Sequence, residues 1–189
     1  MRAIGGLMAV LAAGAAQAQA VDGKTARTLL FPATGAVVEL LPQDFLPEDQ
    51  AALLAAVGAQ QPYYGAIAVS PDEGLMVEAT VAAANYHETE AAERAALAGC
   101  EAKRQGATPC AVVALIRPEG WQAQPLQLSA AATEGFADYG RSGPRALAVS
   151  ASTGLWGLGK GDSAADAAIA DCAAKASPPA ADCAVVIAD

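Results

Sequence analysis

Apolar runs and polar turns alternate along this chain in an order that occurs twice. The runs 66–70 and 146–150 each end in serine, and each is followed by a four-residue turn that closes with glycine. A second apolar stretch, an alanine-rich stretch with helical periodicity and a Cys-Ala-Val-Val run follow in both places. Each copy therefore predicts a strand, a tight turn, a second strand, a helix, a loop and a third strand. The first copy is longer after its turn, which predicts a longer second strand and loop there.

The alanine-rich stretches predict one amphipathic helix in each copy. Thr89 and Ser163 are residue types that cap helix starts, and we expect the helices to end at Cys100 and Cys172. Small and apolar residues recur on one face of each helix, which predicts that this face packs on a sheet: Ala92, Ala96, Leu97 and Cys100 in the first copy, and Ala165, Ala168, Ile169 and Cys172 in the second.

The segments around the two copies predict further elements. Before the first copy, residues 21–61 predict strands at 27–31 and 36–41 and a helix at 47–57. Between copy 1 (62–118) and copy 2 (144–189), the connecting segment 119–143 predicts a strand at 126–128 and a short helix that begins at Ser129. The fold class is therefore α+β, with two strand-strand-helix-strand units, mainly antiparallel sheets, one helix packed on each unit and disulfide staples.

Residues 1–20 have the pattern of a secretory signal peptide. Arg2 precedes a short apolar stretch, and Ala18-Gln19-Ala20 is a small-x-small cleavage site. The stretch is shorter than the roughly 20 apolar residues of a membrane span, and no later segment is apolar enough to be one. We expect a chain that begins at Val21, has no membrane span and lies in the periplasm or is secreted.

Composition narrows the choice of partners. The chain has 189 residues and a formal charge of −9, and removal of Arg2 with the signal peptide makes it one unit more negative. An acidic surface disfavours nucleic acid and anionic membranes. The apolar residues are mostly alanines, with two Trp, four Tyr and three Phe, so we expect a thin core that benefits from covalent staples.

All four cysteines lie in the repeated pattern. A helix end and a strand start about ten residues later occur in both copies, which favours the bridges Cys100–Cys110 and Cys172–Cys183 over the two other connectivities. Zinc sites and redox pairs are the alternatives, but neither the C-x(2–4)-C nor the C-x-x-C spacing occurs. We expect structural disulfides and no metal site.

Candidate chemistry is sparse. Residues 154–161 approach a phosphate-binding loop, but Gly161 stands where the magnesium-binding hydroxyl belongs, so we expect a glycine-rich strand and no cofactor. His87 is the only histidine and the weak candidate for a general base, with Glu88 and a hydroxyl beside it; a solvated loop histidine is the alternative. Ser70 and Ser150 are candidate nucleophiles, although turn-opening serines are common.

Aromatic residues supply a possible recognition surface. The segment Gln60-Gln61-Pro62-Tyr63-Tyr64 and the side chains of Trp121 and Trp156 offer contact area for a partner. The same residues equally suit the cover of a thin core.

The repeated unit resembles a known family. Gly65-Ala66-Ile67-Ala68-Val69-Ser70, Gly74, the helix to Cys100 and Cys110-Ala111-Val112-Val113 resemble the exported bacterial domain of unknown function 4189, as does the second copy. Members of that family continue into a further strand, so the resemblance implies that copy 2 borrows one, from the other copy or from the N-terminal segment. The family brings no established activity.

These observations predict a non-catalytic, disulfide-stabilised module with a binding or structural role in the cell envelope, whose partner is a protein, an envelope component or a small ligand. Two alternatives stay open. One is a small periplasmic hydrolase or transferase that uses His87 in a cleft. The other is a secreted enzyme inhibitor with a protruding stapled loop at 101–109 or 173–182.

Overall fold

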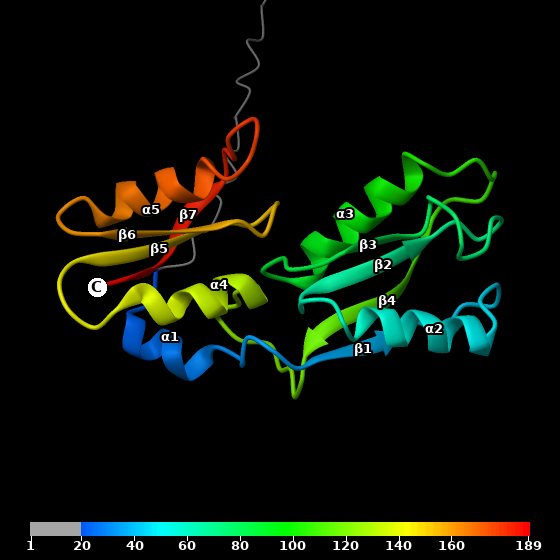
Figure 1. Ribbon diagram of the computed structural model, residues 1–189, viewed down its shortest axis with the longest axis horizontal. Helices are drawn as coiled ribbons and strands as arrows, with labels where there is room; N and C mark the ends of the chain where they lie inside the picture. The colour runs from blue at the N-terminus through cyan, green and yellow to red at the C-terminus, as the bar shows by residue number, and fades with distance from the viewer. Residues whose placement is uncertain (1–19) are drawn as a thin grey trace, which may run out of the picture.

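The computed structural model describes residues 20–189, and it contains two antiparallel sheets that lie side by side, each with helices on both faces (Figure 1). The predicted α+β class and both sheets are confirmed, whereas the predicted signal peptide lies outside the described residues, apart from Ala20. Within the described range, no helix is long and apolar enough to cross a membrane.

The first half is built on the sheet order β1-β4-β2-β3. Helix α3 covers one face of this sheet, and α2 covers the other (Figure 1). The elements of this half are β1 (Ala36–Leu40), α2 (Glu48–Gly58), β2 (Gly65–Val69), β3 (Val81–Ala83), α3 (Thr89–Glu101) and β4 (Ala111–Pro118).

The second half is built on the sheet order β6-β5-β7. Helix α5 covers one face, and three short helices cover the other. The elements are α1 (Gly23–Leu29), α4 (Ala130–Gly135), the 3₁₀ helix η1 (Phe136–Tyr139), β5 (Arg145–Ser150), β6 (Trp156–Lys160), α5 (Ala164–Ala173) and β7 (Cys183–Ala188).

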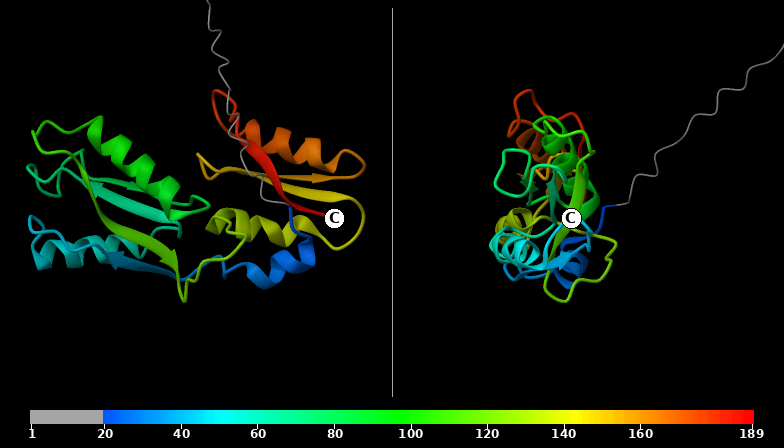
Figure 2. Two further views of the ribbon diagram at one scale, coloured as in Figure 1. Left: turned by 180° about the vertical axis from the view of Figure 1, so that it is seen from behind. Right: turned by 90° about the vertical axis from the view of Figure 1, so that its right-hand side faces the viewer.

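The start of the described chain belongs to the second half. Val21 forms a parallel bridge with Ile187, and its N–H and C=O bond to Val186 and Ala188 at 3.0 Å each. Figure 2 shows the blue start of the chain beside the red β7. The N-terminal segment therefore adds a single β-bridge to the second half, rather than the full strand that copy 2 was expected to borrow.

The two halves share several structural features. Both predicted disulfides form, with Cα–Cα distances of 6.1 Å for Cys100–Cys110 and 6.2 Å for Cys172–Cys183. Each joins the end of a helix to the strand start beneath it. The central strand pairs of the two halves also carry a register shift at the same place, after Ile67 in β2 and after Leu147 in β5.

The predicted strand at 27–31 is wrong. The Asp22 side chain accepts hydrogen bonds from the backbone N–H groups of Lys24 and Thr25, which caps and starts helix α1 instead. This helix buries Ala26 completely against the second half. A capping residue therefore outweighed the apolar run 29–31, of which Leu29 ends the helix and residues 30 and 31 follow it.

Two further expectations about strands need correction. In the first copy, β3 begins only at Val81 and has three residues, so the added length lies in the loop 70–80 rather than in a longer strand. Residues 126–128 form no strand; Leu126 and Leu128 instead insert into the core of the second half. The short helix after Ser129 is confirmed, because the Ser129 hydroxyl accepts a hydrogen bond from Ala132 N–H at 3.1 Å.

The glycine-rich stretch 154–161 serves close packing. A Cβ atom at Gly157 would lie 2.3 Å from the Ala168 carbonyl oxygen of α5, and one at Gly159 would lie 1.8 Å from the Ala164 oxygen. Helix α5 therefore rests directly on the backbone of β6. This close approach explains why a strand carries glycine at alternate positions.

We expect Gly159→Ala to destabilise the protein by about 1–3 kcal/mol or more, because its methyl group displaces α5 from the sheet. Chemical denaturation followed by circular dichroism measures the free energy of unfolding. Lys160→Ala, at the exposed neighbouring position, is the control and changes it by about 0.5 kcal/mol or less. Equal stability of Gly159→Ala and the wild type would contradict this packing.

Candidate functional site

The two halves meet where the loop before α3 touches the turn between β5 and β6. Two residues of the first half have left-handed backbone conformations there, Tyr64 with φ 50° and Asn85 with φ 66°. A Cβ atom at Gly154 of the second half would lie only 2.3 Å from the Asn85 carbonyl oxygen, and Gly154 itself has φ +73°. Glycine is therefore required at position 154 by both the close contact and the backbone conformation.

His87 lies at this junction and joins three segments. The residue is 5% exposed. The backbone N–H of Ser129 donates to Nδ1 at 3.0 Å, so Nδ1 carries no proton. In the neutral ring Nε2 then bears the proton and donates to the Leu155 carbonyl oxygen, also at 3.0 Å. Both ring nitrogens are thus occupied by backbone groups from outside the first half.

Burial lowers the pKa of His87 below its ordinary value of 6.5, while the Leu155 carbonyl and the charge of Asp182 oppose that shift. The ring is neutral at pH 7 and has no free nitrogen for a substrate proton. The interpretation of His87 as a solvated loop residue is therefore wrong. The structure makes it a buried bridge between the halves.

Further hydrogen bonds at the junction lead to the start of α4. Asn85 Oδ1 accepts from Ala131 N–H at 3.0 Å, and the Tyr63 hydroxyl donates to Thr133 Oγ1 at 3.2 Å. Tyr63 and Tyr64 are each 1% exposed and stack edge to face. The segment 60–64 therefore places its tyrosines in the core, with little ring area left for a partner.

The two candidate nucleophiles are also buried. Ser150 Oγ lies 2.6 Å from Asp182 Oδ1 and accepts from Thr153 Oγ1 at 2.6 Å, while Asp182 Oδ2 accepts from Ser152 N–H. Partial burial disfavours the charge of Asp182, but these hydrogen bonds outweigh it and lower its pKa. This network ties the turn to the disulfide loop. Ser70 Oγ, at the corresponding place in the first half, is buried and has no hydrogen-bond partner among residues 20–189.

A crevice of about 280 Å³ opens beside His87, between the first half, the connecting segment and the second half. None of its lining residues, all within the described range, carries a hydroxyl group. The lining residues are His87, Glu88, Gln124, Pro125, Leu126, Gln127, Val149, Ala151 and Val186. His87 and Glu88 thus share a crevice, as the hydrolase hypothesis requires, but the nucleophile that it also requires is not in the lining.

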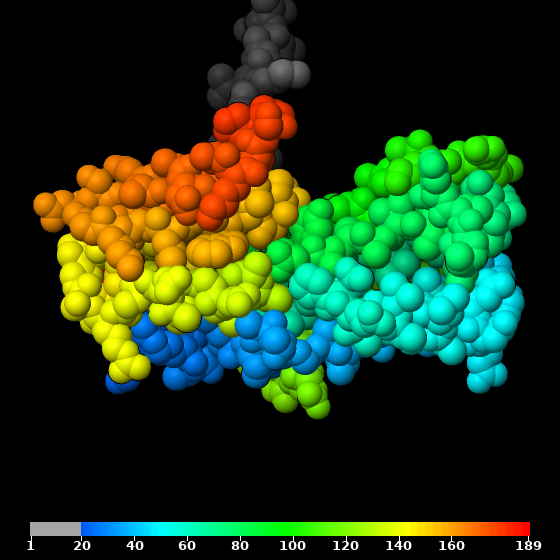
Figure 3. All heavy atoms as spheres, viewed as in Figure 1, coloured from blue at the N-terminus to red at the C-terminus, as the bar shows by residue number. Residues whose placement is uncertain are grey.

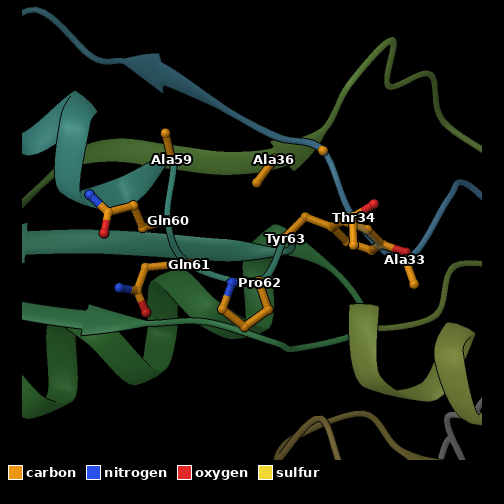
Figure 4. A pocket seen from close by; sticks show the side chains of 9 residues that line it. Ala33, Thr34, Ala36, Ala59, Gln60, Gln61, Pro62 and Tyr63 are labelled. Carbon is orange, nitrogen blue, oxygen red and sulfur yellow. The ribbon is translucent and has the colours of Figure 1, made fainter.

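A second pocket of about 230 Å³ lies in the first half. Residues 33–36, before and at the start of β1, line one side, and residues 59–63, after α2, line the other (Figure 4). Its polar side chains are Thr34, Gln60, Gln61 and Tyr63, and the Tyr63 hydroxyl is already bonded to Thr133. None of these groups titrates near neutral pH, so the pocket offers hydrogen bonds rather than acid–base chemistry.

Both tryptophans are partly buried against the core. The Arg117 guanidinium lies 4.3 Å from the Trp121 ring centre, and Trp121 Nε1 donates to Gln127 Oε1. The Lys175 ammonium lies 4.4 Å from the centre of the Trp156 ring, and a Cβ atom at Gly135 would lie 1.9 Å from the same ring, so only glycine fits there. The packing of both tryptophans agrees with the interpretation that they cover the core.

Across residues 20–189, no group of three or more His, Cys, Asp or Glu side chains is arranged to hold a metal ion. Comparison of the chain with protein-family models, curated proteins and solved structures finds no match.

We expect His87→Ala to lower the free energy of unfolding by about 2–4 kcal/mol, because it leaves Ser129 N–H and the Leu155 oxygen buried without partners and opens a cavity. Denaturant titration measures this loss. Glu88→Ala is the neighbouring control, since Glu88 is 42% exposed and makes only a 3.9 Å ion pair with Arg94. A loss no larger than that of the control would contradict the bridging role.

The low pKa of His87 also predicts a pH dependence. Between its folded pKa and about 6.5 the unfolded chain binds the proton and the folded chain does not, so stability is complete above pH 6.5 and falls as the pH drops below it. Carboxylates with a lowered pKa, such as those of Asp72 and Asp182, change the free energy of unfolding only near and below pH 4, where they take up protons. We expect a lower free energy of unfolding at pH 5 than at pH 7, and no such difference in His87→Gln. If the difference in the free energy of unfolding between pH 5 and pH 7 persists in His87→Gln, another group causes it and the prediction for His87 is wrong.

Proposed function

We propose that this protein is an exported, non-catalytic binding module of the periplasm or the extracellular space. The observation that carries the proposal is the bonding of His87. The one side chain suited to proton transfer at neutral pH has both nitrogens bonded to backbone groups, and it serves to join the two halves.

Two disulfides in a chain of this size support the exported location, because such bonds persist in oxidising compartments. The predicted signal peptide and the resemblance to domain of unknown function 4189, a family of exported proteins, agree with it. Each bridge closes a loop of about ten residues and stabilises the fold by about 3 kcal/mol on the chain-entropy model.

An open crevice beside a rigid junction supports binding over a purely structural role. Its lining comes from four separate segments that the His87 hydrogen bonds and the Cys172–Cys183 staple hold in place. A preformed site loses little conformational entropy when a ligand enters, so this arrangement suits recognition. The hydrolase alternative gains no support, because its base is already bonded on both sides.

We expect protein recovered from the exported fraction of its host to begin at Val21 and to carry both bridges. Mass spectrometry after alkylation, with and without prior reduction, measures the N-terminus and the four cysteines together. Export is expected to form Cys100–Cys110 and Cys172–Cys183, and the same chain expressed without residues 1–20 in a reducing cytoplasm is the control. Retention in the cytoplasm with four free thiols would overturn the exported assignment.

A further inference from the structure

Each sheet ends in two edge strands, and the edges differ in how their outward backbone groups are satisfied. In the second half, Asp171 Oδ2 accepts a hydrogen bond from the Leu158 N–H of β6 at 3.1 Å. Lys175 Nζ donates to the Trp156 carbonyl oxygen of the same strand at 2.6 Å. Val21 pairs with the outward side of β7. Both edges of the second half are therefore partly covered, and in the first half the edge strand β3 has only three residues.

Backbone bonds at the two ends of β1 fix which of its groups face β4. The Gly35 carbonyl oxygen accepts from Glu119 N–H at 2.7 Å, and Leu41 N–H donates to the Val113 carbonyl oxygen at 2.9 Å. The register of β1 on β4 is unbroken between these bonds. Bonded and non-bonded positions alternate in an antiparallel pair, so odd-numbered residues of β1 bond to β4 and even-numbered residues point their backbone groups away from it.

The even-numbered residues of β1 form an open edge. The N–H and C=O groups of Ala36, Val38 and Leu40 have no hydrogen-bond partner among residues 20–189. The strand runs along the lower border of the first half (Figure 1), and the side chains of Val37 and Leu40 are 44% and 37% exposed. Unpaired backbone groups beside exposed apolar side chains are a template for pairing with another strand.

The β1 strand of a second molecule of this protein complements this edge. Antiparallel pairing about a twofold axis at Val38 sets Ala36 opposite Leu40 of the other molecule, a small side chain against a large one. Every outward N–H and C=O group of both strands then has a partner. The same register sets Val37 opposite Glu39, so the two glutamates do not face each other.

Charge does not oppose contact at the edge itself. The chain carries −9, but β1 contains only one charged residue, Glu39, and Arg117 forms an ion pair with it inside each molecule. The next even-numbered residue after Leu40 is Pro42, which has no N–H, so the outward ladder ends with the strand.

We propose that two molecules of this protein associate edge to edge through β1, so that their first-half sheets join into one continuous antiparallel sheet. Such an interface is symmetric, which closes the assembly as a dimer and leaves no β1 edge open for further growth. The inference does not depend on the binding role proposed above, because no residue of β1 lines the crevice beside His87.

Sedimentation velocity and amide hydrogen exchange test the proposal on purified protein with both disulfides formed. The protein is studied from about 1 µM to about 500 µM, in about 0.3 M salt to screen the acidic surfaces. We expect a monomer–dimer equilibrium. At concentrations where nine-tenths of the protein is dimeric, exchange of the Val38 and Leu40 amides is expected to be about tenfold slower than in the monomer. Exchange at Val37 and Glu39, which already bond to β4, is expected to change less than about twofold.

A matched pair of variants locates the interface. Leu40→Lys places a lysine on the edge, which opposes strand pairing, and is expected to lower the association constant at least tenfold. Ile169→Lys, on α5, is the control, because Ile169 is also 37% exposed and the substitution changes the net charge equally. The control is expected to associate as the wild type does. The exchange measurement uses the unaltered chain, so it decides the proposal even if Leu40→Lys disturbs the fold.

Several outcomes would overturn the proposal. A monomer at all concentrations, a dimer with unchanged exchange at Val38 and Leu40, or a dimer that folded Leu40→Lys retains would show that β1 is not the interface. A synthetic peptide of residues 34–42 is expected to slow exchange of the Val38 amide in dilute protein. Equal slowing by a peptide of the same residues in shuffled order would show that the edge accepts other strands as well as its own. None of these results changes the export and disulfide test, so the two proposals fail separately.

Discussion

The two hydrogen bonds of His87 are the interaction on which the arrangement of this protein depends. The ring accepts a hydrogen bond from the Ser129 N–H at the start of α4 and donates one to the Leu155 carbonyl oxygen in the turn before β6. The backbone of His87 belongs to the first half. The ring is buried, so an unmade bond there leaves a polar group without water. The relative position of the two sheets, and with it the crevice between them, follows from satisfying these groups.

In both halves a carboxylate links the turn after the first strand of the repeat to the disulfide loop, but the carboxylate comes from the turn in one half and from the loop in the other. In the first half Asp72, in the turn after β2, accepts hydrogen bonds from the backbone and hydroxyl of Thr108 in the disulfide loop. In the second half the carboxylate is Asp182 of the disulfide loop, and the turn supplies Ser150 and Ser152 as partners. Each staple is therefore tied to the hairpin beside it, and the end of each sheet is held by one covalent and one polar link.

The difference between the halves lies in what closes the remaining sheet face. In the first half Leu75 of the loop 70–80 packs on the cluster that contains Val69 and Val113. In the second half Leu155 packs toward α5 instead, and Leu126 and Leu128 of the connecting segment pack in the cluster that contains Val149. The longer loop thus completes the core of the first half, while the connecting segment completes that of the second half and also lines the crevice beside His87. The two halves, which lie side by side in the space-filling view (Figure 3), are therefore closed by different segments of the chain.

Local pattern determined much of this protein. Apolar periodicity placed α3, α5, β2 and β5, and Ser129 indicated the start of the short helix that follows it. The recurring cysteine spacing predicted both disulfide pairs, because a helix end and the next strand start are close in sequence. The cap at Asp22 was a local signal that would have replaced the expected strand at 27–31 by α1. The role of His87, the partners of Asp182 and the crevice carried no such signal. Ser129 and Leu155 lie 42 and 68 residues from His87, so only the packing of the two halves against each other brings these backbone groups to one ring.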